Sequence, residues 1–377
     1  MFQYKIPVSL YIHMPWCVQK CPYCDFNSHT VKQTPDYDNY INHLIKDLQN
    51  DSIFCLDRSI HSIFIGGGTP SLFSAEHIDH LLSSINNIIS IEKNAEITIE
   101  ANPNSVDAER FNGYQQAGIN RISLGVQSFQ ANKLLSLGRI HNPQEAIDAA
   151  VIAHNLNLRS FNLDLMHGLP NQGLNDALYD LKQAITINPP HLSWYQLTIE
   201  PNTLFGSKPP VLPDDDKLWD IYQQGHQLLT NNGYQQYETS AYAKSNYQCQ
   251  HNLNYWRFGD YLGIGCGAHG KLTQPDGKII RTVKTRHPKG YLDGRYLDNS
   301  FIVTSNELAF EFFMNRFRLF EPCPKLEFEE RTFLPLQTIN KQIDQAMEKN
   351  YITEDLHNWQ ITEHGKLFLN SLLEIFL

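Results

Sequence analysis

Three cysteines lie close together near the start of the chain, at Cys17, Cys21 and Cys24, with the spacing C-x3-C-x2-C. The apolar run before them, residues 8–13, predicts a buried strand, so the cysteines fall on the loop after its carboxyl end. Three thiolates on one short loop can hold three irons of a 4Fe–4S cluster and leave the fourth iron open. A structural zinc site usually has four protein ligands, and no second cysteine pair follows. A zinc site with a distant fourth ligand, or cysteines without metal, are the alternatives.

Strand-like apolar runs alternate with helix-length segments after this loop, and they form the frame that must position the thiols. The six predicted strands cover residues 8–13, 60–65, 96–100, 121–126, 160–165 and 191–198. This alternation implies parallel strands joined by right-handed crossovers. Polar or glycine-rich residues follow the strands, and a βα-barrel places its active site at that end. A doubly wound open sheet is the rival architecture, and the pattern alone does not exclude it.

Capping residues predict two helix starts. Asn142 is followed by Pro143 and Glu145, which gives an N-cap, a proline at the first helical position and an acid in the first turn. The acidic run 214–216 could suggest a metal site. Acidic residues also favour a helix N-terminus, and apolar residues at helical spacing follow, so a helix start is the better interpretation.

Residues 263–270 contain a literal G-x-G-x-x-G. A dinucleotide-binding site would need a βαβ unit and an acidic residue about 20 positions further on, and no clear acidic partner stands there. The glycines are therefore predicted to form a tight loop in which two backbone segments come close together.

The pattern changes near residue 306. It predicts a helix around 310–319, an amphipathic segment at 339–347, a hairpin between 351–353 and 359–362, and a last helix over 363–376. Helices followed by a hairpin are typical of winged-helix-like modules, which often bind DNA. Residues 325–377 carry five Lys/Arg against nine Asp/Glu, so packing or contact with a protein partner is the better interpretation.

The residues around the cysteines, from Tyr11 to His29, resemble the radical S-adenosylmethionine (SAM) superfamily, which has Cys-x3-Cys-x-Tyr-Cys after a first strand. Within it they are most similar to the oxygen-independent coproporphyrinogen oxidase group, in particular its haem-chaperone branch, and the resemblance covers nearly the whole chain. It implies an α/β fold: a partial (β/α)6 TIM-type barrel, open on one side, with a small, mostly helical, winged-helix-like C-terminal domain. The implied divisions are 1–235 for the barrel, 236–305 for a connecting region and 306–377 for the C-terminal domain.

The same resemblance implies two cofactors, a 4Fe–4S cluster on the three cysteines and SAM chelated to the open iron. One electron from a reduced cluster cleaves the sulfonium of SAM and yields a 5′-deoxyadenosyl radical, while the protein orients and shields the cofactor. Glycines at 66–68 would let the backbone approach the methionine part. The SAM contacts implied by the resemblance are Tyr11, Tyr23, Gly68, Thr69, Glu100, Gln127, Arg139 and Asp164.

Two departures from the oxidases bear on function. The oxidases have the cysteine pattern C-x3-C-x2-C-x-C, whereas this chain has Phe26 in place of the last cysteine. The chain also begins almost at the first strand, without the N-terminal extension of the oxidases. We therefore expect a haem chaperone that passes haem to acceptor proteins, membrane-associated respiratory proteins among the candidates. The alternative is the oxidase itself, which decarboxylates coproporphyrinogen III oxidatively in porphyrin biosynthesis, so enzymatic activity is left open. A radical SAM enzyme that modifies RNA is a third reading, and the acidic charge counts against it.

Haem needs an apolar pocket and an axial ligand. The segment 251–256 matches the family motif H-N-x-x-Y-W, and in it Tyr255 and Trp256 could flank a porphyrin face beside His251. A lone histidine is more often hydrogen-bonded in a core than bound to a metal. His29 and His269 are the weaker candidates.

The composition sets the broad class. The 377 residues are 41% hydrophobic and 19% charged, which suits a soluble protein with one large and one smaller domain. No stretch approaches the roughly 20 apolar residues of a membrane span, and residues 1–5 lack the apolar core of a signal peptide, so a cytoplasmic protein is expected. Seven cysteines, an odd number with three clustered, argue for metal binding over disulfides, and a net charge of −10 argues against nucleic-acid binding. The cysteines expected to be ordinary thiols are Cys55, Cys249, Cys266 and Cys323.

Overall fold

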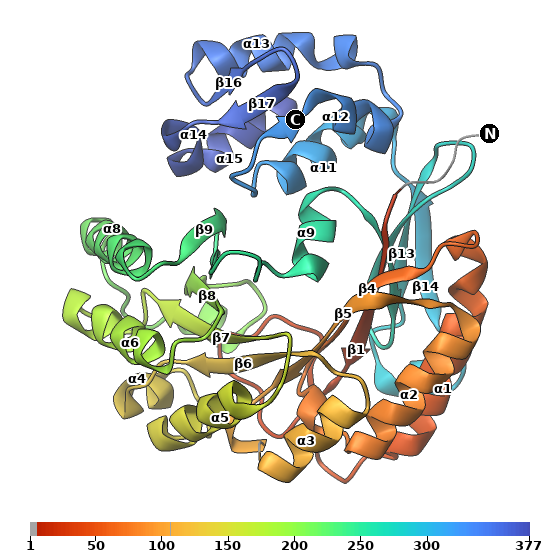
Figure 1. The fold of residues 1–377 in the computed structure, drawn as a ribbon, viewed down its shortest axis with the longest axis vertical. Helices are drawn as coiled ribbons and strands as arrows, with labels where there is room; N and C mark the ends of the chain where they lie inside the picture. The colour runs from red at the N-terminus through yellow and green to blue at the C-terminus, as the bar shows by residue number, and fades with distance from the viewer. Residues whose placement is uncertain (1–5, 106) are drawn as a thin grey trace.

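A twelve-stranded, curved sheet organises the computed structural model, which describes residues 6–105 and 107–377 (Figure 1). In spatial order the strands are β14 (Leu297–Ile302), β13 (Ile279–Lys284), β12 (His269–Thr273), β11 (Asp260–Ile264), β1 (Val8–Met14), β4 (Ile60–Gly67), β5 (Ile91–Ala101), β6 (Arg121–Gln127), β7 (Ser160–His167), β8 (His191–Gln196), β10 (Ala241–Ala243) and β9 (Gln235–Glu238). The sheet ends at β14 and β9, so the barrel is open on one side. The predicted lack of a signal peptide rests on residues 1–5, which lie outside the described residues.

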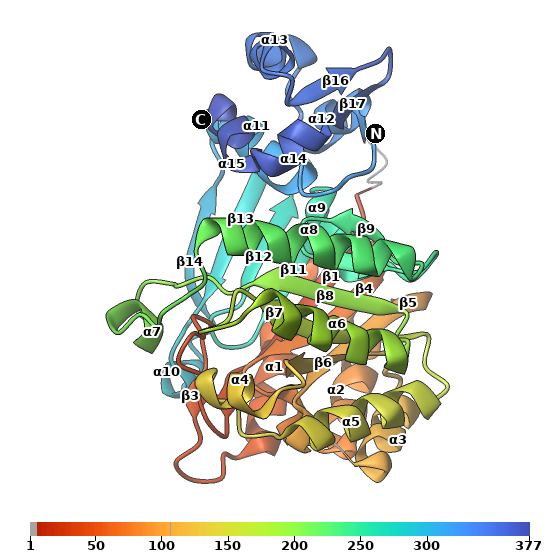
Figure 2. The same cartoon turned by 90° about the vertical axis from the view of Figure 1, so that its left-hand side faces the viewer.

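The six predicted strands all form, and they pair in parallel in the order β1, β4, β5, β6, β7, β8. The main crossover helices are α1 (Tyr37–Asp51), α2 (Ala75–Ile88), α3 (Ala108–Gln116), α5 (Pro143–Asn155) and α6 (Leu174–Ile187), and α8 (Asp215–Asn231) follows β8. These helices cover the outer face of the curved sheet (Figures 1 and 2). The predicted partial (β/α)6 barrel is confirmed, because a doubly wound sheet would have its crossover helices on both faces.

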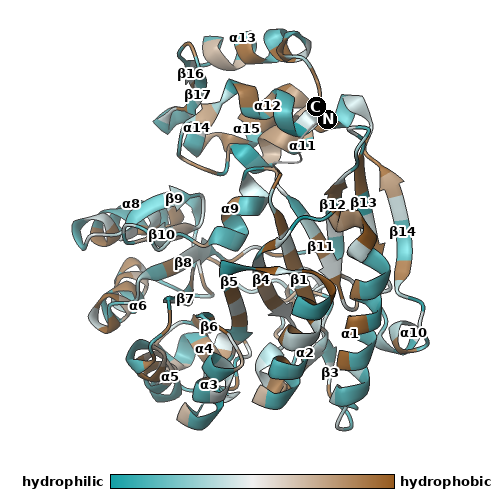
Figure 3. Cartoon of the chain, turned by 45° about the vertical axis from the view of Figure 1, so that its right-hand side comes forward, coloured by the Kyte–Doolittle hydropathy of each residue, from teal (hydrophilic) through white to brown (hydrophobic). Residues whose placement is uncertain are grey.

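Burial of apolar side chains explains this arrangement. Leu10, Ile12, Ile63 and Ile65 of the first two parallel strands are completely buried, as expected for strands covered on both sides. Figure 3 shows the hydrophobic strands inside and hydrophilic residues along the outward surfaces of the helices. The apolar face of each crossover helix therefore packs on the sheet and fixes the positions of the loops at the strand ends.

Both predicted helix starts are confirmed. The Asn142 side chain accepts a hydrogen bond from the Glu145 backbone N–H at 3.0 Å, and the Glu145 carboxylate accepts one from the Asn142 N–H at 2.8 Å. Asp214 accepts from the Lys217 backbone N–H at 3.0 Å at the start of α8. The acidic run at 214–216 is thus a helix N-terminus, as its composition favours.

The glycine-rich segment 263–270 forms the end of β11, a tight turn and the start of β12. Gly265 has φ = +96°, and a Cβ there would lie 2.4 Å from the backbone oxygen of His13. The predicted tight loop with close backbone approach is confirmed. The strand itself was missed: β11 pairs in parallel with β1 and adds a seventh parallel strand. Residues 236–305 therefore contribute strands to the same sheet as the barrel.

The C-terminal residues pack around a second hydrophobic core, to which Phe258 and Ile279 also contribute, and they form a winged-helix-like module. Its elements are α11 (Ser305–Arg316), β15 (Cys323–Pro324), α12 (Lys325–Thr332), α13 (Asn340–Glu348), β16 (Ile352–Glu354), β17 (Asn358–Ile361), α14 (Glu363–Leu367) and α15 (Leu369–Leu373). The predicted hairpin is present, and the predicted last helix is interrupted at Phe368. Among the described residues no helix has the length and apolar character needed to cross a membrane.

Candidate cluster and cofactor site

The cysteine loop leaves the barrel at the carboxyl end of β1. Two short strands, β2 (Trp16–Cys17) and β3 (His29–Thr30), pair in parallel and close the base of the loop. The loop is also tied to distant parts of the barrel. The Gln19 side chain donates to the Gly138 backbone oxygen at 3.1 Å, and the Phe205 N–H donates to the Pro22 oxygen at 2.9 Å. These bonds hold the three cysteines over the strand ends.

The three thiols line one cavity of about 770 Å³, here called the cluster cavity. Burial raises the pKa of the Cys17 thiol; a hydrogen bond with Thr69 opposes this rise, and the nearby thiols Cys24 and Cys21 add to it. Burial raises the pKa of Cys24 in the same way. Within the described part of the chain, no three His, Cys, Asp or Glu side chains are gathered into a preformed metal-binding group. The three thiols thus lie on one cavity wall, but they are not arranged as a ready-made site for a single metal ion.

The glycine turn after β4 forms the wall beside the cysteines. The Gly68 N–H donates to the Met14 backbone oxygen at 2.7 Å, and a Cβ on Gly68 would lie only 2.6 Å from the Trp16 oxygen. Only glycine fits this close approach between the turn and the strand that leads into the cysteine loop. Thr69, the next residue, is buried and lines the same cavity.

Two carboxyl groups lie deep in the cluster cavity, at the ends of β5 and on β7. Glu100 accepts a hydrogen bond from the Gly67 N–H at 3.0 Å, and Asp164 accepts from the Ser123 hydroxyl at 2.9 Å and the Asn162 amide at 2.8 Å. Burial and the nearby Asp164 raise the pKa of Glu100 to about 8. Burial also raises the pKa of Asp164, against the effect of its hydrogen bonds. The pair can receive hydrogen bonds from a ligand's hydroxyl or ammonium groups.

Arg139 connects the carboxyl ends of the strands to the cysteine loop. Its guanidinium donates to the Cys21 sulfur at 3.5 Å, to the Asn102 side-chain oxygen at 2.6 Å and to the Gly125 backbone oxygen at 2.8 Å. Its Nε–H is buried and has no hydrogen-bond partner among the described residues. Arg139 therefore places a positive charge beside Cys21, and its Nε–H is free to donate a hydrogen bond to a bound ligand.

Gln127 ends β6 in the left-handed region, with φ = +68°. This unusual conformation places a non-glycine residue at the turn after the strand, and its amide oxygen accepts a hydrogen bond from the Tyr195 hydroxyl at 2.9 Å. Tyr23, on the cysteine loop, packs against Phe205 with ring centroids 6.4 Å apart. Both predicted residues line the cluster cavity.

The structure thus brings most of the predicted site residues together. Those that line the cluster cavity are Cys17, Cys21, Cys24, Tyr23, Gly68, Thr69, Glu100, Gln127, Arg139 and Asp164. Tyr11 and His251 are the exceptions, because neither is part of this wall.

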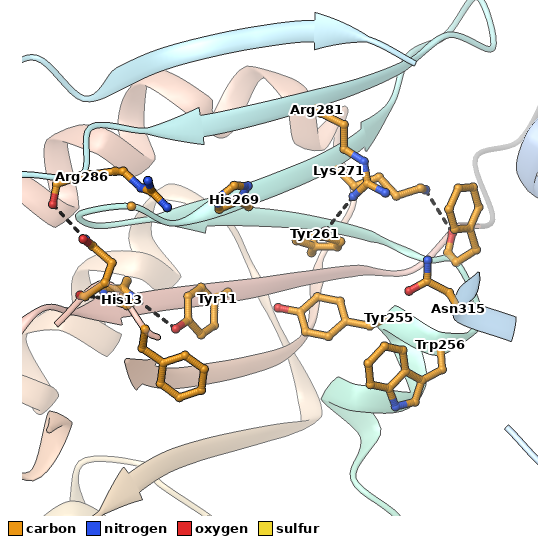
Figure 4. Close-up of a pocket in the computed structure, with 14 residues that line it drawn as sticks. Tyr11, His13, Tyr255, Trp256, Tyr261, His269, Lys271, Arg281, Arg286 and Asn315 are labelled. Atoms are coloured by element: carbon orange, nitrogen blue, oxygen red, sulfur yellow. Dashed lines mark hydrogen bonds between the residues drawn. The ribbon is translucent and has the colours of Figure 1, made fainter. Parts of the chain in front are cut away.

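Tyr11 lines a neighbouring cavity of about 440 Å³, here called the aromatic cavity (Figure 4). Its hydroxyl donates to His13 Nδ1 at 2.9 Å, and His13 Nε2 donates to the Asn27 backbone oxygen at 2.8 Å. Burial lowers the pKa of His13 to about 4, so the ring is neutral, in agreement with this pattern of one donor and one acceptor nitrogen. Phe26 and Trp256 line both cavities, so the two spaces adjoin.

His251 lies in the core beside the aromatic cavity, on α9 (Gln250–Trp256). Its Nδ1 is 2.9 Å from the Ser62 hydroxyl and its Nε2 is 2.9 Å from the Tyr255 hydroxyl. Burial lowers its pKa to about 3, and the ring packs against Phe64 at 5.2 Å. Both ring nitrogens are therefore engaged in hydrogen bonds, and iron ligation by His251 would require the helix or its partners to move.

Sequence reasoning did not include several residues that support this site. Asn102 links Arg139 to Thr69, to which its amide donates at 3.1 Å. Ser123 and Asn162 hold the Asp164 carboxylate, and Tyr195 holds Gln127. Asn102 follows the carboxyl end of a predicted strand, and this position is the signal that could have identified it. Ser123, Asn162 and Tyr195 lie within predicted strands, where no such signal marks them.

Two family models match the chain. The Radical SAM superfamily model matches residues 11–183, and the HemN C-terminal domain model matches residues 303–368. The first match contains the cysteine loop and all the strand ends of the cluster cavity up to β7. The second covers most of the winged-helix-like module.

Relatives of known name match almost the whole chain. The heme chaperone HemW of Escherichia coli K12 is 65% identical over 371 residues, and that of Haemophilus influenzae is 64% identical over 375, with 98% of each chain covered in both cases. The solved structure of coproporphyrinogen III oxidase (HemN) from Escherichia coli matches with a TM-score of 0.84 at 21% identity, over 98% of this chain and 90% of that one, which supports the fold. The chain therefore belongs to the HemW family of the radical SAM superfamily.

Proposed function

We propose that this protein is a radical-SAM-type haem chaperone: it binds a 4Fe–4S cluster, SAM and haem, and transfers haem to acceptor proteins. The single observation that carries the proposal is the near-complete match, at 65% and 64% identity, to two proteins named heme chaperone. The cytoplasm is the proposed location, and the acceptors include membrane-associated respiratory proteins. In this proposal residues 1–235 bind the cofactors, residues 236–305 contain the haem motif, and residues 306–377 serve packing or contact with a partner.

The residues of the cluster cavity fit a cluster and SAM. Three thiols share one wall, Arg139 keeps a buried N–H without a partner, and Gly68 leaves no side chain at the closest approach. Cys17, Cys21 and Cys24 would hold the cluster, and Gly68, Thr69, Glu100, Gln127, Arg139, Asp164, Tyr23 and Tyr11 would contact SAM or close its site. A reduced cluster, when bound, supplies one electron for cleavage of the SAM sulfonium.

The protein's own groups would orient the cofactor and limit water. The Arg139 guanidinium donates to the Cys21 sulfur at 3.5 Å and so helps to fix the position of that sulfur on the cavity wall. The protonated Glu100 carboxyl can donate a hydrogen bond at neutral pH, because its pKa is about 8, while Gly67 fixes its orientation. Phe26 separates this cavity from the aromatic cavity and occupies the place of the fourth cysteine of the oxidase motif.

The alternative is oxygen-independent coproporphyrinogen III oxidase, which the likeness to HemN in fold keeps in view. One experiment separates the two functions: anaerobic incubation of reconstituted protein with SAM, a reductant, and either coproporphyrinogen III or haem. We expect a stable haem absorption band and no protoporphyrinogen IX. Multiple turnovers of coproporphyrinogen III to protoporphyrinogen IX would place the chain among the oxidases instead.

A further inference from the structure

We propose that haem is seated in the aromatic cavity, with His269 as the ligand of its iron and the Arg286 guanidinium as the partner of a propionate. This inference rests on the proposed haem-binding function, and it names the site. Both residues line the cavity, His269 at the start of β12 and Arg286 in the loop after β13 (Figure 4).

The choice of His269 follows from the state of the histidines nearby. His13 is also on the cavity wall, but its two nitrogens are bonded to Tyr11 and Asn27. His251 is buried with both nitrogens bonded and is not on the wall. The His269 side chain is exposed in the cavity and makes no hydrogen bond within the described residues. Partial burial and the nearby Arg286 and Arg281 lower its pKa, which favours the neutral imidazole that binds iron.

The cationic side chains that line the aromatic cavity can be compared in the same way, by whether they already have a partner. Lys271 is buried and donates to the Asp260 carboxylate at 3.2 Å and to the Phe258 oxygen at 3.0 Å. Arg281 pairs with Glu311 and also donates to the Tyr261 hydroxyl at 2.8 Å. Their charges are therefore already compensated.

Arg286 differs from both. Its side chain is exposed, and no ion pair or hydrogen bond of its guanidinium is present in the described part of the structure. An uncompensated guanidinium at the rim of an aromatic cavity suits a ligand with an apolar body and a carboxylate at its edge. A haem with its propionates has this form.

Aromatic side chains supply the apolar surface. Tyr255 and Trp256 come from α9, and Phe26 comes from the cysteine loop, where it is 58% exposed in spite of its apolar ring. Covering such rings with a porphyrin removes apolar surface from water and contributes much of the affinity. The volume of about 440 Å³ lies within the range of small-molecule sites. Because Phe26 and Trp256 also line the cluster cavity, the haem would lie next to SAM.

The test is a spectral titration of the full-length, reconstituted protein with ferric haem, combined with electron paramagnetic resonance of the bound haem. We expect His269→Ala and His269→Gln to lose the histidine-ligated spectrum, and added imidazole to restore it in His269→Ala. Arg286→Ala should keep the spectrum and weaken affinity about tenfold, the effect of one charge-assisted contact. The matched controls are His80→Ala, an exposed histidine on α2, and Arg295→Ala, an exposed arginine outside the cavity.

The outcomes distinguish the site from the function. If the wild-type protein binds haem and both His269 variants keep its spectrum, the site is wrong while the haem-chaperone function stands. If His80→Ala changes the spectrum as much as His269→Ala, the assignment of the ligand is also wrong. If the wild-type protein does not bind haem at all, the proposed function itself fails. Circular dichroism of each variant shows that it is folded before its spectrum is compared.

Discussion

The Gly67 backbone N–H donates a hydrogen bond of 3.0 Å to the Glu100 carboxyl group, and this bond joins the glycine turn after β4 to the end of β5. Glu100 lines the cluster cavity, where burial and, to a smaller extent, the nearby Asp164 raise its pKa. The Glu100 side chain therefore both holds the glycine turn in place and contributes a titratable group to the cofactor site.

A pH-dependent loss of stability is expected from Glu100. Its pKa is about 8 in the folded protein, against an ordinary value of 4.5, so the folded state holds a proton that the unfolded state has released between these values. The free energy of unfolding therefore falls as pH rises from about 5 to 8, by at most about 1.4 kcal/mol per pH unit. Glu100→Gln should remove this slope. Urea denaturation of the cofactor-free protein at a series of pH values measures it.

The control for this prediction is Glu348→Gln, a change of an exposed carboxyl group at the end of α13. That variant should keep the wild-type pH dependence. Equal slopes for Glu100→Gln and the wild type would show that Glu100 is ionised normally in the folded protein.

Gly68→Ala should destabilise the turn and weaken SAM binding. The added Cβ would meet the Trp16 backbone oxygen at 2.6 Å, so the turn must move away from the cysteine loop, at a cost of about 1–3 kcal/mol. Thermal unfolding and equilibrium dialysis with SAM measure the two effects. Gly173→Ala is the matched control, because only the Asp176 carboxylate lies near its Cβ, at 4.0 Å. Unchanged SAM affinity in Gly68→Ala would remove the glycine turn from the cofactor site.

Each of Cys17→Ala, Cys21→Ala and Cys24→Ala should lose the 4Fe–4S cluster, because three thiolates are the fewest that hold three irons. Iron and sulfide assays after anaerobic reconstitution measure the loss. Cys55→Ala removes a buried thiol that is not part of the cluster cavity, and it should keep the full cluster content. A triple variant of the three loop cysteines that still carries four irons and four sulfides would contradict the assignment.

Arg139→Ala should shift the reduction potential of the cluster to a more negative value. The guanidinium lies 3.5 Å from the Cys21 sulfur, and a cation there stabilises the reduced cluster more than the oxidised one. Each 1.4 kcal/mol of lost stabilisation corresponds to about 59 mV for one electron. A redox titration followed by electron paramagnetic resonance measures the shift. Arg159→Ala, at the opposite end of β7, should leave the potential unchanged, and an equal shift in both variants would exclude a local effect of Arg139.

Much of the barrel could be predicted from the sequence because its signals are local. Each of the six strands is a run of apolar residues, and the caps at Asn142 and Asp214 satisfy backbone donors within three residues. The seventh parallel strand, β11, was missed because its pairing with β1 joins segments about 250 residues apart. Gly263 within the strand and Gly265 directly after it also have the composition of a loop.

The residues of the cluster cavity could be predicted better than those of the aromatic cavity, again because of how far apart in the sequence the contributing segments lie. The resemblance to the radical SAM superfamily pointed to Glu100, Gln127 and Asp164, and parallel pairing of the predicted strands brings the carboxyl ends of their strands together. The aromatic cavity needs Tyr11, α9 and the antiparallel strands β12 and β13 at once. The engagement of both nitrogens of His251 depends on Ser62, which lies 189 residues away in the sequence, so the sequence motif alone could not reveal it.

The most direct test of the haem-chaperone function is the transfer of bound haem. Reconstituted protein is loaded with one equivalent of haem, freed of excess by gel filtration and mixed with a haem-free respiratory acceptor protein, and the absorption bands of both proteins are followed. We predict that loading saturates at one haem per chain and that the acceptor gains haem faster from the loaded protein than from the same concentration of free haem. Loading that never saturates, or an acceptor that gains haem no faster than from free haem, would contradict the proposed function.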